Sequence, residues 1–424
     1  MFPFFKKKEP VKAPEPDVIH EDGGICIANR WWFEPEIGEL SFNMTDSSKH
    51  RSSVISIVGS HGTGKNFTSK LILYRLCKEG AQATVLVSGL SRQKYGYMCD
   101  LLGGKTVFLG ENAHINLFDI RKPNEDRCKG SVLERKIREL LAVFKTLMPG
   151  IIPKQTALLD MMLHEVYKKK GITLDNASLF VEGTNQYKEF PTIEDLYMTI
   201  KLSKVKELEE FADRLSLFVD GPYGWFNYKT DIDWDSPFLV LDFMEYKGKI
   251  NKDNSAKEFM MAYCFEILSE RMQNDADKKA ILLCDVFFGE SQDVMKYGPY
   301  MLEQDTTLGW SKYICQNAML NNCTVISATS VFNYDEDLTF LHEIMLDADV
   351  QVYHHIWSHL VPEVAKACHL TKKQAELISD LTIAQVYILA DGKFIWGRVD
   401  ASEEEYKTLT EYPPDIRVYG RDWQ

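Results

Sequence analysis

Short apolar runs alternate with segments of helical periodicity along most of the chain. Val54–Val58 is a continuous apolar run, which predicts a strand buried on both faces. Asn66–Cys77 carries apolar residues at helical spacing and predicts a helix directly after that strand. The same reasoning predicts further strands at Thr84–Val87, Thr106–Leu109, Phe238–Leu241, Ala280–Cys284, Thr324–Ala328 and Val350–Tyr353. This alternation predicts an α/β fold with a mostly parallel sheet wrapped by helices.

Two other segments have a different pattern. Residues 131–220 carry apolar residues at helical spacing, interrupted by prolines and glycines, and predict a helical block inserted between strands. Near the C-terminus, Val386–Ala390 and Phe394–Arg398 flank Asp391-Gly392, which predicts a β-hairpin.

These patterns divide the chain into four parts. Residues 1–24 are predicted to be a flexible tail, since residues 6–17 are rich in Lys, Pro and Glu. Residues 25–130 form the first part of the α/β core, and residues 131–220 form the helical insertion. Residues 221–424 complete the core and end in the hairpin and a tail.

Composition narrows the class of protein. The chain has 49 Lys+Arg and 62 Asp+Glu among 424 residues, so its net charge is 49 − 62 = −13. An acidic balance of this size disfavours a protein that grips duplex nucleic acid over most of its surface. Nine cysteines without a C-x-x-C pair indicate a reducing compartment, and the absence of a long apolar run predicts no transmembrane segment.

A glycine-rich loop follows the first buried strand and opens the first helix. Its sequence, G-S-H-G-T-G-K-N, matches G-x-x-x-x-G-K-[ST] except at the last position. In such a loop backbone N–H groups converge on phosphates, the helix N-terminus adds positive potential, and the lysine reaches the terminal phosphate oxygens. We therefore expect ATP to be bound by Gly59, Gly62, Thr63, Gly64, Lys65, Asn66 and Phe67.

The metal and catalytic positions depart from the usual pattern. Asn66 stands where a Ser or Thr hydroxyl would bind Mg²⁺, and Thr68 lies on another face of the helix. Asp285 ends an apolar strand and is the second candidate ligand for Mg²⁺, with Asp242 as the competing assignment. Val286 follows where a water-activating Glu is usual, which leaves Glu290 as the nearest carboxylate.

One cluster of histidines is a weaker candidate for chemistry. His354, His355 and His359 form H-H-x-x-x-H, which could hold zinc on a helix. The preceding V-Q-V-Y run favours the end of a strand instead, so we interpret these histidines as structural.

With these motifs in view, the chain resembles the energising ATPases of type IV secretion and conjugation machines, of the HerA/FtsK type. The resemblance rests on the loop, on the I-N-L-F-D segment at Ile115–Asp119, and on the strands ending near Asp285 and Ser330. It implies a RecA-like P-loop NTPase core with an inserted all-helical subdomain. It also implies that Ser330 is a sensor of the terminal phosphate. The segment Gly309–Lys312 lacks the family's Arg, which leaves Lys312 as the cation.

The resemblance and the altered positions together predict a function. They imply a nucleotide-binding subunit at the cytoplasmic face of the inner membrane, assembled into a homo- or hetero-oligomer with secretion or conjugation subunits. Because a general base alone is worth roughly 10²–10⁴-fold in rate, we expect weakened or absent ATP hydrolysis. The alternatives are a HerA/FtsK-type ATPase that binds and translocates DNA, and a purely structural pseudo-ATPase scaffold.

Overall fold

The computed structural model describes most of the chain, and its centre is one large sheet. The described residues are 19–31, 36–87, 91–109, 113–120, 130–148, 150–221, 223–242, 254–274, 276–284, 310–331, 345 and 347–411. Within them an 11-stranded sheet runs in the order β2-β1-β11-β10-β9-β3-β8-β7-β4-β6-β5. Asp285 and Glu290 lie outside the described residues.

Seven neighbouring strands of this sheet are parallel, as the alternating pattern predicts. In spatial order they are β9 (Val350–Tyr353), β3 (Val54–Gly59), β8 (Cys323–Ser330), β7 (Lys279–Cys284), β4 (Gln82–Val87), β6 (Phe238–Asp242) and β5 (Lys105–Phe108). All the side chains of β3 are buried, which is why this strand reads as a continuous apolar run.

The other four strands continue the sheet in antiparallel fashion. They are β10 (Gln385–Ala390), β11 (Lys393–Arg398), β1 (Ile25–Trp31) and β2 (Glu36–Phe42). The predicted hairpin is confirmed, with Asp391 and Gly392 both at positive φ. The hairpin of β1 and β2 was not assigned from the sequence. Residues 19–24, which we placed in the tail, reach it through a bridge between His20 and Ser41.

Helices cover both faces of the sheet. On one face lie α1 (Lys65–Lys78), α2 (Ser91–Leu101) and α14 (Glu403–Thr410), which share one hydrophobic cluster. On the other face lie α3 (Val132–Lys145), α8 (Asn254–Met272) and α10 (Trp310–Ala318), which share a second. Apolar residues between the strands at Phe238–Leu241 and Ala280–Cys284 also predict a helix around 255–271, which is α8, whereas α2, α10 and α14 were not assigned from the sequence.

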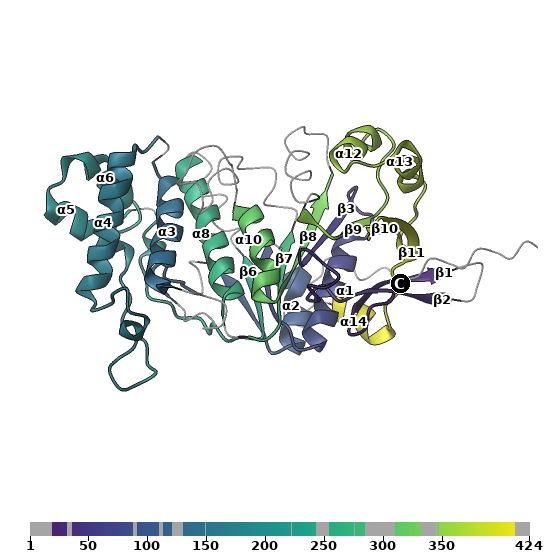
Figure 1. Ribbon diagram of the computed structural model, residues 1–424, viewed down its shortest axis with the longest axis horizontal. Coiled ribbons are helices and arrows are strands. Elements are labelled where there is room, and N and C mark those ends of the chain that lie inside the picture. The colour runs from purple at the N-terminus through teal and green to yellow at the C-terminus, as the bar shows by residue number, and fades with distance from the viewer. Residues whose placement is uncertain are drawn as a thin grey trace, which may run out of the picture.

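The helical block lies at one end of the molecule, on the left in Figure 1, and β1 and β2 lie at the other. After α3 it contains α4 (Pro153–Lys169), α5 (Ile193–Ser203) and α6 (Glu209–Ser216), with short 3-10 turns at Asn176–Leu179 and Lys206–Leu208. A further 3-10 turn, Gly224–Phe226, follows the block. Its core is continuous with that of the sheet.

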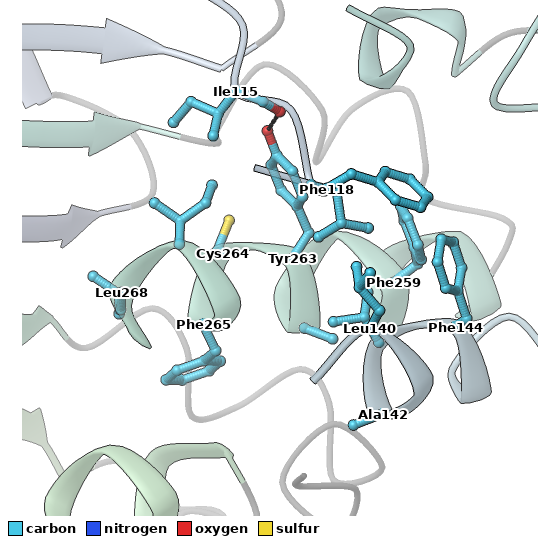
Figure 2. Packing of buried hydrophobic residues seen from close by; sticks show 14 of the residues in the cluster. Ile115, Phe118, Leu140, Ala142, Phe144, Phe259, Tyr263, Cys264, Phe265 and Leu268 are labelled. Atoms are coloured by element: carbon cyan, nitrogen blue, oxygen red, sulfur yellow. Dashed lines mark hydrogen bonds between the residues drawn. The ribbon is translucent and has the colours of Figure 1, made fainter. Parts of the chain in front are cut away.

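Aromatic side chains join the helical block to the sheet. In Figure 2, Phe144 of α3 packs beside Phe118 and Phe259, with ring centroids 5.9 Å apart in both pairs. The Tyr263 hydroxyl of α8 donates to the Ile115 carbonyl over 2.6 Å. The I-N-L-F-D segment therefore lies at the interface between the helical block and the sheet core, where burial of several aromatic rings stabilises it.

Two helices near the carboxyl ends of the strands complete the fold. They are α12 (Val361–Ala367) and α13 (Lys372–Ser379), and they pack with residues of β9 and β10 in a third hydrophobic cluster. Another 3-10 turn, Met319–Asn321, links α10 to β8. Within the described part of the chain, no helix is both long enough and apolar enough to cross a membrane.

Candidate functional site

The glycine-rich loop connects the carboxyl end of β3 to the first turn of α1. Gly62 has a φ of 78° and Gly64 a φ of 103°, a backbone conformation that other residues adopt only with strain. Gly59 is required for a different reason, since a Cβ there would lie 2.7 Å from the Cβ of His354 and 2.8 Å from the Thr63 hydroxyl oxygen. The predicted strand, loop and helix are therefore confirmed. The backbone conformation of the turn explains Gly62 and Gly64, and close packing explains Gly59.

Lys65 is buried inside the loop. Its ammonium donates to the Ser60 carbonyl over 2.9 Å, and the Thr63 hydroxyl donates to the same carbonyl over 2.8 Å. A buried ammonium needs an anionic or carbonyl partner because burial removes its water. A phosphate oxygen inside the loop would be a stronger partner than the Ser60 carbonyl, because it carries a full negative charge that attracts the ammonium.

His354 braces the loop from the neighbouring strand. It follows β9 directly, is almost fully buried, and has its Nδ1 3.0 Å from the Thr63 carbonyl and its Nε2 3.0 Å from the Thr68 hydroxyl. A carbonyl can only accept, so Nδ1 carries the proton and Nε2 accepts from Thr68. Burial, and then the charge of Lys65, lower the pKa of His354 to about 4, so the ring is neutral at pH 7.

The residues after His354 form one wall of the loop. The Ser60 N–H donates to the His355 carbonyl over 2.9 Å, and the Trp357 N–H donates to the Ser60 hydroxyl oxygen over 2.9 Å. From the sequence, His354 and His355 were weighed as zinc ligands and interpreted instead as structural residues at the end of a strand. Their position directly after β9 agrees with the strand-end interpretation. Their contact with the loop was missed, because the sequence does not say that β9 lies beside β3.

The first turn of α1 places the remaining predicted nucleotide ligands. Asn66 is exposed, and Phe67 is partly buried with its ring 5.9 Å from that of Tyr406 in α14. Thr68 is buried with its hydroxyl bound to His354, so it does not supply the hydroxyl that is absent at position 66.

The sheet order separates the two candidate acidic strands. Adjacent strands lie about 4.8 Å apart, so β7 is ~10 Å from β3, with β8 between them. β6, which ends at Asp242, is four strands away, or ~19 Å. This order favours the carboxyl end of β7, directly before Asp285, over Asp242 as the acidic partner of the loop.

Ser330 ends β8 and pairs with Gly59 in register, so it lies beside the first residue of the loop. Lys312 stands in the first turn of α10. The turn from α10 into β8 is short, so that first turn faces the carboxyl edge of the sheet. The roles of Ser330 as sensor and of Lys312 as a cation stay predictions.

A second group of charges lies between α3 and α8. Lys136 contacts Glu266 and lies 3.4 Å from Glu270, and the ligand atoms of Glu139, Glu266 and Glu270 all lie within 4.8 Å of one another. All four side chains are buried. Because the Lys136 ammonium already neutralises part of this charge, we interpret the group as a structural ion cluster.

Comparisons with known proteins support the fold. No protein-family model matches the sequence, and no curated protein matches it. The structure of VirB4 of Thermoanaerobacter pseudethanolicus aligns with a TM-score of 0.71 at 18% identity, over 92% of this chain and 100% of that chain. The chain has a VirB4-like fold. The predicted α/β RecA-like fold is confirmed, and the resemblance to VirB4 is one of fold.

A conjugative protein aligns more weakly. The unbound bacterial conjugative coupling protein TrwB aligns with a TM-score of 0.47 at 9% identity, over 83% of this chain and 85% of that chain. TrwB in complex with ADP and Mg²⁺ aligns with a TM-score of 0.45 at 12% identity, over 83% and 86%. At these scores the alignments carry no argument about the present chain.

Proposed function

We propose that this chain is a nucleotide-binding subunit of a type IV secretion or conjugative transfer machine, which it energises or assembles. The observation that carries the proposal is the buried Lys65 ammonium inside a glycine loop between β3 and α1. A buried cation at a helix N-terminus, in a loop whose glycines let backbone N–H groups converge, is built for a phosphate chain. The VirB4-like fold over nearly the whole chain supports the choice of machine.

The proposed cofactors are ATP and Mg²⁺. Lys65 and the loop would hold the β- and γ-phosphates. The Asn66 carboxamide oxygen and Asp285 would hold the metal ion, which neutralises phosphate charge when it is bound. A carboxamide is a neutral ligand on a longer arm than a hydroxyl. We therefore expect Mg²⁺ to raise ATP affinity less than in P-loop proteins that carry Ser or Thr at this position.

Hydrolysis is proposed to be weak. Val286 cannot activate water, and the short Ser330 side chain beside Gly59 replaces a longer sensor amide. Losses of this kind lower turnover by roughly 10²–10⁴-fold for the base alone. ATP would then act mainly as an assembly signal, with the chain in an oligomer on the cytoplasmic side of the inner membrane.

Calorimetric titration with ATP, with and without Mg²⁺, tests nucleotide binding, and a steady-state phosphate-release assay tests turnover. We expect binding that Lys65→Ala abolishes and that Lys372→Ala, which removes an exposed lysine on α13, leaves unchanged. ATP turnover at the rate of ordinary motor ATPases, lost in Lys65→Ala, would refute weak hydrolysis but keep the nucleotide site. Failure to bind ATP at all would refute the nucleotide-binding proposal.

A further inference from the structure

Trp357 presents a large aromatic surface beside the phosphate loop. The residue is 40% exposed, although its backbone N–H is fixed to the Ser60 hydroxyl at 2.9 Å. Its ring stacks against that of His359, with centroids 5.9 Å apart and planes 25° apart. An exposed tryptophan held by its own backbone and backed by a second ring is a rigid apolar face that costs little entropy to use in binding.

The loop has two sides, and they differ in chemistry. On the β8 side, Ser330 pairs with Gly59, and β7 follows as the next strand. On the β9 side, His355 and Trp357 contact Ser60. The candidate sensor Ser330 lies on the first side, so a bound nucleotide would point its terminal phosphate toward β8. A nucleotide that extends away from that side carries its ribose and base toward β9.

We propose that Trp357, supported by His359, is the platform on which the base of the bound nucleotide stacks. This inference rests on the proposed nucleotide-binding function and adds the part of the ligand that the phosphate loop does not recognise. Ligands in open α/β sheets bind at the carboxyl ends of the strands, where Trp357 lies. Stacking reads the face of a base and not its edge, so adenine and guanine nucleotides gain alike from Trp357.

A competing platform exists on the other flank of α1. Phe67 and Tyr406 lie with ring centroids 5.9 Å apart, and Tyr406 is 60% exposed. Phe67 packs against the hydrophobic cluster under α1 and uses part of its ring there. Trp357, in contrast, is bonded directly to a loop residue, and this contact favours it over Tyr406.

The test compares ATP with tripolyphosphate, which carries the phosphates without a base. Both are titrated into the full chain and into Trp357→Ala, Trp357→Phe and Tyr406→Ala, with Tyr228→Ala as the control for loss of an exposed ring far from the loop. We expect Trp357→Ala to weaken ATP binding roughly 5- to 150-fold, the range for loss of one base stack, and to leave tripolyphosphate binding unchanged. Trp357→Phe should retain most of the ATP affinity.

Three other results would refute the proposed role of Trp357, and they differ in what they imply for nucleotide binding. Equal loss of ATP and tripolyphosphate in Trp357→Ala would mean that the residue only shapes the loop. Normal ATP binding in Trp357→Ala, with loss in Tyr406→Ala, would place the base on the α14 side and leave nucleotide binding intact. A wild-type chain that binds neither ligand would refute the proposed function and the platform together.

Discussion

Replacing His354 with Asn tests the two buried hydrogen bonds that this histidine makes, to the Thr63 carbonyl in the phosphate loop and to the Thr68 hydroxyl in α1. The Asn amide can still donate to the Thr63 carbonyl, but it is too short to accept from Thr68. The change therefore leaves one buried hydroxyl without its acceptor, at a cost of roughly 1–3 kcal/mol at pH 7.

The pKa of His354 also predicts how the free energy of unfolding changes with pH. The pKa of His354 is about 4 in the folded chain and about 6.5 when the chain is unfolded. Between these values the unfolded histidine binds a proton that the folded one does not, so a falling pH favours unfolding. At 1.36 kcal/mol per pH unit, the full effect is about 3 kcal/mol, of which about 2 kcal/mol is lost between pH 7 and pH 5.

The assay is urea unfolding of the wild type and of His354→Asn at pH 7, 6 and 5. Asn does not titrate, so the stability advantage of the wild type should shrink by about 2 kcal/mol over this range. His164→Asn, which replaces a partly exposed histidine on α4 in the helical block, is the control for the substitution itself. A difference between the wild type and His354→Asn that does not change with pH would refute the neutral, buried histidine.

Three further changes probe the surrounding structure. Lys136→Met leaves a group of buried carboxylates without their cation and should cost roughly 3–5 kcal/mol in urea unfolding at pH 9. The deficit should shrink at pH 7, because burial raises the pKa of Glu266 to about 8 and that of Glu139 above its usual range, and a protonated carboxyl needs no cation; a pH-independent deficit would contradict this. Gly59→Ala places a Cβ against His354, so it should lower the free energy of unfolding by roughly 1–3 kcal/mol and weaken ATP binding. An unchanged free energy of unfolding and an unchanged ATP affinity would show that the loop accommodates the added methyl group. Arg75→Ala removes the ion pair to Glu405 at 2.7 Å, and mass spectrometry should detect faster proteolysis within α14, whereas an unchanged rate would mean that α14 is held by other contacts.

The local parts of the site could be predicted from the sequence. A buried strand, a glycine loop and a helix follow each other within 25 residues, and each imposes a backbone conformation that its own residues reveal. The Asp391-Gly392 hairpin was predictable for the same reason, since the turn needs two residues at positive φ. The hairpin of β1 and β2 and helices α2, α10, α12, α13 and α14 were missed. Thr371–Gln374 and Ser402–Glu405 form capping boxes at the starts of α13 and α14, and this local signal could have predicted both helices.

The sequence by itself determined that strands alternate with helices and that one loop is built for phosphate. Only the tertiary structure decided which strands are neighbours. The buried strands all read as similar apolar runs, so nothing local says that β9 lies beside β3. That pairing brings His354 to Thr68, 286 positions away, and Trp357 to Ser60. The physical reason is that strand order is decided by packing across the whole sheet, whereas a glycine turn is decided by the dihedral angles of its own residues.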